Sequence, residues 1–545
     1  MAKYVFGIDL GTTYSCIAYV DETGRATVVK NSEGDNTTPS VVNFSSPNEV
    51  VVGQIAKENA VIEPDSTIAL VKTLMGKTDF AIEYNGEDKS PEEVSAYILK
   101  KVANDASKQI NEEVKDVVIT CPAYFGTAER QATKNAGEIA GLNVLEIINE
   151  PTAAALYYGC AKEQGNKTIL VYDLGGGTFD VTIMNINQDT IEVVCADGNH
   201  ELGGRDWDDA IINYIADQVT AQEGEDFEFD GYMLQDMRLK AEAAKKQLTN
   251  RESTPIAIDA GGNRIRVNLS REMFDELTES LLSQTIDKTD SAIAIAKEKG
   301  FSIDEILLVG GSTRMPQVTK RLVEKYGVEP KILEPDEAVA KGAAIHAVNV
   351  YVNNQKSLSQ GATGETTVTI GGVKKEINAD DYKEELAVQP EMMSIGGKPQ
   401  KVINATTKSF SIKVLNNNKE VCKNLIIKNQ PMPDGVIKAS GVFGTASDNQ
   451  DTVFLEVYES DIMDELFDID EDYRLGDATL ELPGNMPAGA PIEVIFSLNS
   501  EGILEVTGID KTSGREIKAT MQTKGVMAAE KVAELKEKSK QIVVM

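Results

Sequence analysis

The sequence predicts an α/β fold of two similar lobes, followed by an all-β domain and a short C-terminal helix. Three observations carry this prediction. An apolar strand runs into a glycine turn and back into a strand at residues 169–183, and a similar stretch occurs at residues 5–20. After residue 406, short strands of period-2 polarity alternate with polar turns, as in all-β domains. A helical pattern then covers residues 528–540.

The stretch at residues 169–183 has the features of a phosphate site. Its three glycines, Gly175, Gly176 and Gly177, leave no Cβ to obstruct a close backbone approach, and their N–H groups can point at one anion. Asp173 enters the turn and Asp180 leaves it, so two carboxylates flank the same hollow. Amides for phosphate oxygens and carboxylates for Mg²⁺ or its waters are what such a site needs. A plain hairpin is the alternative interpretation, because one glycine motif alone is weak evidence.

The N-terminal stretch repeats this pattern. It contains Asp9, Leu10, Gly11, Thr12 and Thr13, which follow the pattern Asp-Leu-Gly-x-Thr. The stretch at residues 169–183 has the same pattern with one additional glycine. Two such hairpins, widely separated in one chain, predict two similar lobes with one nucleotide between them. No Walker sequence occurs where the hairpins lie, so a P-loop fold is not predicted.

Composition excludes several classes of function. A length of 545 residues is enough for three or four domains at about 150 residues each. The formal net charge of −33 disfavours nucleic acid and anionic membranes as partners. Two histidines, His200 and His346, are too few for a His-rich metal site. Five cysteines without CxxC spacing indicate thiols in a reducing compartment. With no signal peptide and no apolar run that could span a bilayer, we expect a soluble cytoplasmic protein.

The first part of the chain alternates helical and strand patterns. The predicted helices cover residues 91–110, 127–140, 201–219, 233–248, 271–299 and 336–352, and the predicted strands include residues 41–44, 117–122, 143–148, 191–196 and 306–309, with a hairpin at 256–269. Two residues in this part have two interpretations each. Lys72 is either a solvated helix position or a functional lysine. Glu150, next to a proline at a helix start, either favours the helix N-terminus or points into a cleft.

The character of the sequence changes after residue 352. Residues 353–405 are polar and contain a small predicted hairpin at 366–377, so we interpret them as a linker. The all-β domain covers residues 406–523, and residues 524–545 form the helical tail. The predicted strands of the β-domain are residues 410–415, 425–428, 453–458, 478–482, 492–498, 503–509 and 517–522.

Five motifs together resemble those of the seventy-kilodalton heat-shock chaperones of the DnaK type. They are the two Asp-Leu-Gly hairpins and residues 149–155, 310–316 and 336–344, and they match in order and at compatible spacing. The resemblance is strong over residues 3–347 and weaker over residues 406–538. It implies an α/β actin-like two-lobed ATPase domain (1–352), the linker, a β-sandwich peptide-binding domain and a residual helical tail. The implied function is an ATP-dependent molecular chaperone that binds extended apolar segments of unfolded proteins and hydrolyses ATP to ADP and phosphate.

The resemblance also implies roles for single residues. Asp9, Asp173 and Asp180 are the residues implied in binding K⁺ and Mg²⁺, the latter through water. The residues implied in hydrolysis are Lys72, Glu150, Asp173, Thr178 and Asp180, of which Lys72 and Glu150 place and polarise the attacking water. The residues implied in nucleotide binding are Gly11, Thr12, Thr13, Tyr14, Gly175, Gly176, Gly177, Gly203, Gly204, Glu242, Lys245, Lys246, Thr249, Gly310, Gly311, Ser312, Arg314 and Asp336. Pro122 and Arg130 are implied in a relay that connects the nucleotide site with the partner domain.

In the β-domain, residues 442–450 match the family's peptide cleft. From this match, the implied peptide-binding residues are Ile412, Leu415, Phe443, Ala446, Val453 and Leu455. The alternative is that these residues are ordinary sandwich core, because strand residues on one face usually are. An extended peptide held by backbone hydrogen bonds, with one apolar side chain in a pocket, is the implied mode of binding.

The sequence departs from the family in four places. The first lobe is shortened after Lys77 relative to the family. The usual linker of consecutive leucines is missing, and only Leu386, Ala387 and Val388 could replace it. Glu146 stands where the family commonly has a basic residue that meets the J-domain co-chaperone, so this partner is disfavoured. The lid is reduced to one short helix, so we expect fast peptide release in both nucleotide states. In addition, residues 460–477 are strongly acidic, which favours basic peptides or simply keeps an edge solvated.

Three other functions are compatible with parts of the pattern. A small-molecule kinase of the same fold would leave the β-domain without a role, and an actin-type filament protein would lack a peptide cleft. An ATP-sensing protein with one dedicated partner and weak or uncoupled hydrolysis is the main alternative to the chaperone. The expected partners are unfolded or extended polypeptides and a nucleotide-exchange factor, without nucleic acid or membrane.

Overall fold

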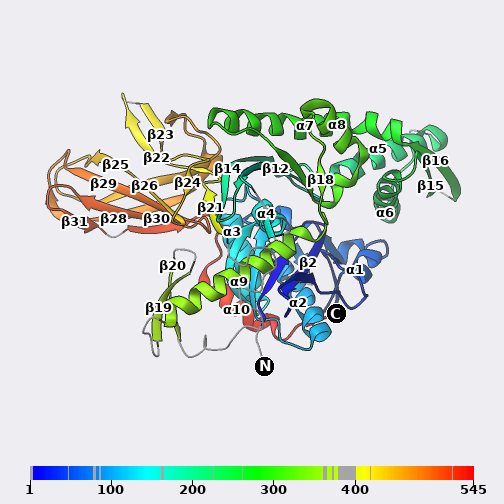
Figure 1. Cartoon of the computed structure of the whole chain (residues 1–545), viewed down its shortest axis with the longest axis horizontal. Helices are drawn as coiled ribbons and strands as arrows, with labels where there is room; N and C mark the ends of the chain where they lie inside the picture. The colour runs from blue at the N-terminus through cyan, green and yellow to red at the C-terminus, as the bar shows by residue number, and fades with distance from the viewer. Residues whose placement is uncertain are drawn as a thin grey trace.

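The computed structural model describes residues 4–46, 48–77, 82–84, 87–160, 165–224, 226–260, 262–359, 365–370, 373–378, 400–417, 419–517 and 519–545. Two large sheets form the frame of the first half (Figure 1). The first has the order β11-β10-β1-β2-β3, and its strands are β1 (Phe6–Asp9), β2 (Tyr14–Val20), β3 (Ala26–Val28), β10 (Asp116–Cys121) and β11 (Asn143–Asn149). β1 pairs antiparallel with β2 and parallel with β10.

The second sheet has the order β18-β17-β12-β13-β14-β21-β24. Its strands are β12 (Lys167–Leu174), β13 (Phe179–Ile186), β14 (Thr190–Asn199), β17 (Glu305–Val309), β18 (Lys331–Ile332), β21 (Lys401–Ala405) and β24 (Pro431–Met432). Here too an antiparallel hairpin, β12–β13, lies beside a parallel strand, β17. The repeat of this arrangement confirms that two similar units carry the two glycine hairpins. We call residues 4–160 lobe I and residues 165–337 lobe II.

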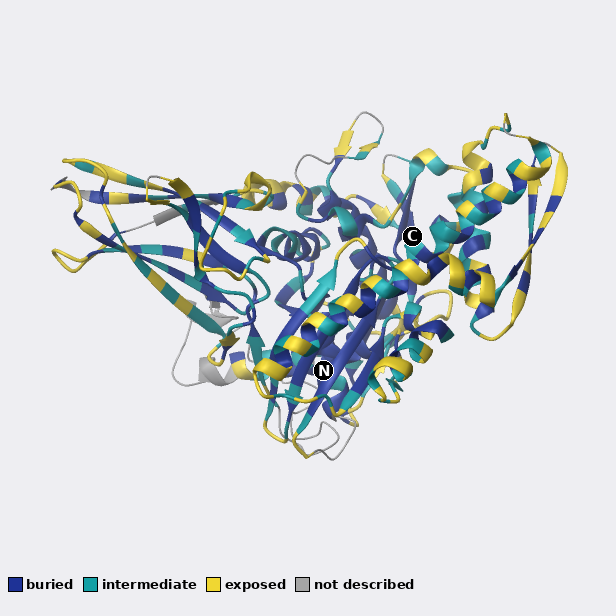
Figure 2. Ribbon diagram, turned by 90° about the horizontal axis from the view of Figure 1, so that it is seen from above, coloured by how far each residue is buried: buried dark blue, intermediate teal, exposed yellow. Residues whose placement is uncertain are grey.

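Helices α4 (Glu150–Cys160) and α9 (Ala338–Ser359) pack against each other between the two sheets, where one apolar core joins both lobes. The helix crossing is close enough to require glycine. A Cβ on Gly342 would lie 1.7 Å from the Ala153 carbonyl oxygen, and a Cβ on Gly7 would lie 2.1 Å from the Ala344 nitrogen. The central strands are accordingly buried on both faces (Figure 2).

The other elements of the lobes surround these sheets. The helices are α1 (Gln54–Asn59), α2 (Pro91–Ile110), α3 (Thr127–Ile139), α5 (Gly204–Glu223), α6 (Gly231–Leu248), α7 (Arg271–Glu298) and α8 (Pro316–Tyr326), with 3₁₀ turns η1 (Pro64–Ser66), η2 (Val71–Leu74) and η3 (Gly311–Arg314). The strands are β4 (Thr38–Pro39), β5 (Val41–Ser46), β6 (Glu49–Val52), β7 (Thr67–Ala69), β8 (Ile82–Tyr84), β9 (Glu87–Lys89), β15 (Ser253–Ala260) and β16 (Asn263–Ser270). N-caps explain the predicted first residues of helices α2 and α7. Ser90 accepts a hydrogen bond from the Glu93 amide, and Ser270 accepts one from the Met273 amide.

Two further sheets enclose a separate apolar core and form a β-sandwich. The larger has the order β27-β23-β22-β26-β28-β32 and the smaller β25-β29-β30-β31. The strands are β22 (Ser409–Asn416), β23 (Lys419–Ile426), β25 (Val436–Gly444), β26 (Gln450–Ser460), β27 (Leu466–Phe467), β28 (Arg474–Met486), β29 (Pro491–Asn499), β30 (Leu504–Asp510), β31 (Arg515–Ile517) and β32 (Ala519–Thr523), with a 3₁₀ turn η6 (Glu471–Tyr473). Between residues 409 and 523, the regular elements in the described part of the chain are these strands, β24 and one 3₁₀ turn, as in an all-β domain.

The predicted linker needs two corrections. Helix α9 begins at Ala338 and runs to Ser359 instead of ending at residue 352. Residues 401–405 form β21, which pairs in parallel with β14 and extends the sheet of lobe II. The small predicted hairpin is present as β19 (Glu365–Ile370) and β20 (Val373–Asn378). The segment Leu386–Ala387–Val388 lies outside the described residues.

The tail packs on lobe I. Helix α10 (Ala529–Ser539) lies against α3, and β33 (Val543–Val544) pairs in parallel with β6 in the sheet β33-β6-β5-β7. The C-terminus therefore ends beside α1 (Figure 1). The sequence predicted a helix here, but not the strand that follows it.

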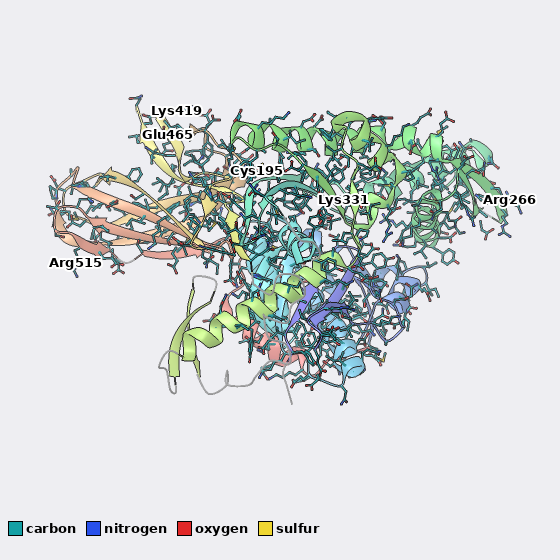
Figure 3. All side chains as sticks on the ribbon, in the orientation of Figure 1. Cys195, Arg266, Lys331, Lys419, Glu465 and Arg515 are labelled. Atoms are coloured by element: carbon teal, nitrogen blue, oxygen red, sulfur yellow. The ribbon has the colours of Figure 1, made fainter. Side chains whose placement is uncertain are left out.

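The sandwich contacts both lobes. The Thr127 amide, at the start of α3, donates to the Glu459 carboxylate at 3.1 Å, and the Lys134 ammonium lies 3.1 Å from the Glu501 carboxylate. On lobe II, the Ala196 amide donates to the Asn429 side-chain oxygen at 3.1 Å. Cys195, labelled in Figure 3, is buried in lobe II next to this second contact. No helix in the described part of the chain is long and apolar enough to cross a membrane.

The contact between Glu459 and α3 is expected to strengthen as the pH falls. Burial, and secondarily the charge of Glu129, raises the pKa of Glu459 to about 7, although Lys408, the Thr127 amide and Arg130 act in the other direction. The docked state therefore favours the neutral carboxyl. Its stability is lowest above pH 7 and rises as the pH falls from 7 towards 4.5, by about 3 kcal/mol in total.

The measurement is hydrogen exchange at the Thr127 amide between pH 8 and pH 6, corrected for the intrinsic rate. Protection should increase towards pH 6 in the wild type and become independent of pH in Glu459→Gln. Glu465→Gln, which changes an exposed carboxylate of the same sandwich, serves as the control. Equal pH dependence in Glu459→Gln and the wild type would show that another group titrates.

Candidate functional site: a cavity between the two lobes

A cavity of about 880 Å³ lies between lobes I and II and is lined by residues from both. Lobe I contributes Asp9 and residues 11–14 from the first hairpin, and Lys72 from η2. Lobe II contributes Asp173, Gly175, Gly176 and Thr178 from the second hairpin, and the residues of α6 and η3 described below. The cavity thus lies where the two glycine hairpins predicted a shared ligand.

The two glycine turns meet at a distance that excludes side chains. A Cβ on Gly176 would lie 1.7 Å from the Thr13 hydroxyl, and a Cβ on Gly177 would lie 2.8 Å from a methyl carbon of Thr12. Gly203 packs on the same turn, because its Cβ would lie 2.4 Å from the Gly177 backbone. Glycine is therefore required here by close approach between the lobes.

Four carboxylates and one buried lysine lie at this end of the cavity. Glu150, Asp173 and Asp180 are each less than a tenth exposed, and Asp9 is partly buried. Burial, together with the charge of Glu150, raises the pKa of Asp9 to about 7 and the pKa values of Asp173 and Asp180 well above their usual range. The Asp180 Oδ1 atom is buried and has no hydrogen-bond partner among the described residues. The site therefore holds more negative charge than its own residues neutralise.

Lys72 is the cation of this group. Its Nζ lies 2.5 Å from Glu150 Oε1, and both side chains are buried. Burial disfavours the ammonium form, but the charges of Glu150 and Asp9 outweigh it and raise the pKa of Lys72 above its ordinary value. Leu70, in a left-handed conformation (φ 61°), turns the chain into η2 and so brings Lys72 to the cavity. This burial excludes the interpretation of Lys72 as a solvated position.

A network of charged groups closes the other end of the cavity. Glu242 of α6 accepts hydrogen bonds from Lys57 at 2.5 Å, from Tyr14 at 3.0 Å and from Lys246 at 2.7 Å. Burial alone would raise the pKa of Glu242, but the charges of Lys57 and Lys246 lower it to about 2. Because Tyr14 and Lys57 belong to lobe I and the other two residues to lobe II, this network joins the lobes across the cavity.

The remaining predicted residues line the side of lobe II. Lys245 donates to the Gly204 carbonyl at 2.6 Å and pairs with Asp208 at 2.8 Å. Ser312 donates to the Gly175 carbonyl at 2.9 Å, and Arg314 pairs with Asp336 at 2.6 Å. The lining also includes Thr249, Gly310 and Gly311.

Most predicted nucleotide-site residues line the cavity, and three do not. Gly177, Gly203 and Asp180 lie directly behind the lining. Pro122 and Arg130 are also outside it: the Arg130 guanidinium is buried and donates to the Phe125 carbonyl at 2.8 Å and to the Asn149 side chain at 2.6 Å. Arg130 thus connects the turn before α3 to the residue preceding Glu150.

Sequence reasoning missed several lining residues. Lys57, Asp208 and Arg238 contribute charged groups to the cavity. The i, i+3, i+4, i+7 spacing of the predicted α6 residues could have suggested Arg238, which lies one turn earlier on this helix. Lys57 and Asp208 have no comparable signal, because each is brought to the cavity only by the packing of the two lobes.

The predicted peptide-binding residues do not share one surface. Ile412 and Leu455 are buried in the sandwich core, and Phe443 and Val453 pack against that core at its edge. Leu415 is 69% exposed, and Ala446 is exposed in the turn between β25 and β26. For Ile412 and Leu455 the burial favours the alternative of ordinary core.

The acidic segment at residues 460–477 has basic neighbours of its own. Asp461 pairs with Lys408 and Lys428, and Glu465 lies 3.4 Å from Lys423. Lys419, paired with Asp468, is also labelled in Figure 3, where it and Glu465 lie at the sandwich edge that points away from lobe I. These pairs favour a solvated edge as the role of the acidic residues.

Glu146 also has a partner within the chain. Its carboxylate lies 3.0 Å from Nε2 of His346 on α9, and both side chains are largely buried. The negative charge at this position is therefore not freely presented to a partner protein.

The fold and the cavity define the class of this protein: a two-lobed α/β protein with a cavity between its lobes and an appended β-sandwich. The family described as "Hsp70 protein" matches residues 5–81, 77–357 and 373–544. The chain therefore belongs to the Hsp70 family.

Individual relatives agree with this assignment. The chain is 39% identical to the chaperone protein DnaK of Thermosipho africanus over 522 residues, which cover 94% of this chain and 79% of the relative. It is 37% identical to that of Thermosipho melanesiensis, covering 99% and 83% of the two chains, and 38% identical to that of Thermotoga petrophila, covering 94% and 79%. The protein is thus an ATP-dependent molecular chaperone and an ATPase, and nothing in these similarities favours the ATP-sensing alternative.

Proposed function

We propose that ATP binds in the cavity between the lobes with its phosphates on the two glycine hairpins and its adenosine against α6 and η3. The contact of the two glycine turns across the cavity is the observation that carries this proposal. The backbone N–H groups of residues 176–178, with Thr12 and Thr13, are suited to phosphate oxygens, while the Gly175 amide donates to the Thr178 carbonyl and closes the turn. Lys245, Lys246, Thr249 and Ser312, with Glu242, offer the polar groups that a ribose and a base require. Gly204, Gly310, Gly311, Arg314 and Asp336 complete this side.

The buried carboxylates fit a hydrated Mg²⁺ ion. The raised pKa values of Asp173 and Asp180, and the Asp180 oxygen without a hydrogen-bond partner among the described residues, indicate a missing positive charge. No group of three or more potential ligands among the described residues is arranged to bind a metal ion directly. We therefore infer that Asp9, Asp173 and Asp180 would hold Mg²⁺ through water, and that K⁺ would use the same carboxylates. When bound, Mg²⁺ would neutralise charge on the phosphate oxygens.

Lys72 and Glu150 are suited to place the attacking water. Glu150 can accept a proton or a hydrogen bond from this water, while Lys72 holds the carboxylate in place and offers a positive charge to the γ-phosphate. Thr178, at the end of the glycine turn, lines the cavity beside them. Phosphoryl transfer to water needs mainly such placement of charge and nucleophile.

For the whole chain, we propose an actin-like ATPase domain that ends with α9, a connection whose last part is β21, and a peptide-binding β-sandwich followed by the tail. The relay between them would run from Glu150 through Asn149, Arg130 and Pro122 to α3, which contacts the sandwich. Extended polypeptides are the proposed substrates, with a nucleotide-exchange factor as partner. Glu146 is paired with His346, so position 146 offers no free basic group to a J-domain partner, and this partner stays disfavoured. The cytoplasm is the proposed compartment.

A test of the peptide site uses exposed positions, where substitution does not disturb the core. Leu415→Asp and Ala446→Asp are expected to weaken the binding of an apolar extended peptide by about tenfold or more, because each places a charge against an apolar side chain. Ile332→Asp, which makes the same change at an exposed position of lobe II, is the matched control.

Peptide affinity is measured by fluorescence anisotropy, and single-turnover ATP hydrolysis is followed with and without the peptide. The wild type and Ile332→Asp should bind peptide equally and respond to it equally. Unchanged affinity in both Leu415→Asp and Ala446→Asp would move the peptide site elsewhere on the sandwich. Hydrolysis that ignores bound peptide in the wild type would mean that the two halves are uncoupled.

A further inference from the structure

One arginine in the cavity has no role in the site described above. Arg205 is the second residue of α5, and it lines the cavity from the side of lobe II. Its side chain is 31% exposed, so the guanidinium is partly sheltered from water. Charge pairs that are sheltered in this way are stronger than pairs on the open surface.

Most other cations of the cavity are already paired within the chain. Seven lysine and arginine side chains line it. Five of them lie 2.8 Å or less from a carboxylate oxygen, namely Lys57, Lys72, Lys245, Lys246 and Arg314. The sixth, Arg238, is exposed on α6, and Arg205 is the seventh.

Arg205 has no carboxylate within hydrogen-bond distance among the described residues. Its ion pair is with Asp206 Oδ1 at 3.8 Å, which is too long for a hydrogen bond. The other carboxylate oxygen of Asp206 accepts a hydrogen bond from the Gly203 amide at 2.7 Å. A guanidinium offers five N–H donors in a planar fork that matches phosphate oxygens. Arg205 therefore presents donors to the cavity that no described residue uses.

The backbone fixes Arg205 beside the second glycine turn. The Arg205 amide donates to the Gly176 carbonyl at 2.7 Å, and the Gly204 amide donates to the Gly175 carbonyl at 2.9 Å. Residues 203–205 thus run along the turn whose amides are proposed for phosphate oxygens. An arginine side chain that starts here is long enough to reach an anion held on this turn.

Arg205 also lies towards the adenosine side of the turn. Its neighbour Gly204 contacts both α6 and η3, because its carbonyl accepts from Lys245 at 2.6 Å and a Cβ on it would lie 2.2 Å from the Ser312 hydroxyl. Lys72 and Glu150 belong to the opposite, carboxylate end. The phosphates nearest to Arg205 are therefore those next to adenosine, which ADP and ATP share.

We propose that the Arg205 guanidinium binds the α- and β-phosphates of the nucleotide and raises the affinity for ATP and ADP alike. This inference rests on the ATP site proposed above and adds to it a residue from outside the two hairpins. Lys72 cannot serve these phosphates, because Glu150 holds it at the other end. A charge-assisted pair with phosphate is shorter and stronger than the neutral hydrogen bonds that backbone amides donate.

The test compares Arg205→Met with the wild type by titration calorimetry with ATP, ADP and adenosine, each with Mg²⁺. Methionine keeps the apolar stem and removes the charge. The affinities for ATP and ADP are expected to fall by about tenfold or more, and by factors that agree within about threefold. Adenosine carries no phosphate, so its affinity should change by less than about twofold.

Two further variants separate the shape of the guanidinium from its charge. Arg205→Lys keeps the positive charge but not the fork, and its affinities should lie between those of the wild type and Arg205→Met. Arg266→Met removes an exposed arginine of β16, labelled in Figure 3 at the end of lobe II away from the sandwich. It makes the same change to the net charge of −33 and should bind both nucleotides as the wild type does.

The proposal is overturned if Arg205→Met binds ATP and ADP as the wild type does. It is also overturned by an equal loss of adenosine affinity, which would mean a distorted site, or by a loss confined to ATP, which would place the contact on the γ-phosphate. Gly176→Ala distinguishes these results from a failure of the ATP site itself. A loss of affinity in Gly176→Ala beside unchanged binding in Arg205→Met excludes Arg205 alone, whereas unchanged binding in Gly176→Ala moves the nucleotide out of this cavity.

Discussion

Replacing Lys72 with methionine is expected to lower the single-turnover rate of ATP hydrolysis by a factor on the order of 10²–10³. Methionine keeps the length and the apolar stem of the lysine but removes its charge. The Lys72 ammonium pairs with Glu150 at 2.5 Å. Among the described residues, no other lysine or arginine forms an ion pair with this carboxylate. Without it, Glu150 loses the partner that fixes its position.

The effect should fall on the rate and much less on nucleotide affinity. Lys72 lies at the carboxylate end of the cavity, while the polar groups proposed for adenosine come from α6 and η3 at the other end. An interaction made mainly in the transition state lowers the rate without weakening ground-state binding. ATP affinity, measured by titration calorimetry, is therefore expected to change by less than about tenfold.

Lys57→Met provides the matched control. It removes a second cavity lysine, paired with Glu242 at the far end, and should therefore change nucleotide affinity more than the hydrolysis rate. The opposite pattern, with Lys72→Met binding ATP poorly and hydrolysing what it binds at the wild-type rate, would assign Lys72 to nucleotide binding and exclude it from hydrolysis.

Gly176→Ala is expected to weaken ATP binding by about a hundredfold. The added Cβ would lie 1.7 Å from the Thr13 hydroxyl and 2.8 Å from the Thr13 Cβ, distances at which atoms cannot coexist. The two hairpins must then move apart, and the amides of the two turns no longer point at the same phosphates. A displacement of about 1 Å between groups that bind one ligand costs an effect of this size.

Gly175→Ala is the matched control for Gly176→Ala. Its Cβ would meet only the Thr178 oxygens at 3.6 Å, an ordinary contact, so the same methyl group is added one residue away without a clash. The loss of affinity should be several times smaller than in Gly176→Ala. Titration calorimetry with ATP and ADP measures both variants, and equal losses would show that flexibility of the turn matters more than the close approach of the lobes.

Much of the secondary structure could be predicted because its causes are local. Pro91–Ile110 has an apolar stripe, an N-cap serine and an acidic first turn, and α2 has these bounds. The hairpin β12–β13 was visible in an apolar run interrupted by three glycines. Predictions were less accurate where no local signal exists: residues 353–359 are polar and were interpreted as the start of a linker, but α9 continues to Ser359.

The candidate site was predictable to the extent that it resides in hairpins. Asp9, Asp173 and the glycines lie in short motifs whose residue types suit phosphates. Lys57 and Asp208 carry no such signal, and their place in the cavity depends on elements that meet only in the folded chain. For the same reason, the burial of Ile412 and Leu455 could not be decided from their alternating pattern, which pocket and core residues share.

By itself, the sequence determined the class of fold, the two glycine hairpins and the all-β character of the second half, because periodicity and glycine turns are local properties. Only the tertiary structure decided that Gly176 meets Thr13, that Glu242 joins the lobes through Tyr14 and Lys57, and that the tail adds a strand to lobe I. These contacts join residues far apart in the chain, and their energies arise from burial and pairing that a linear pattern does not contain.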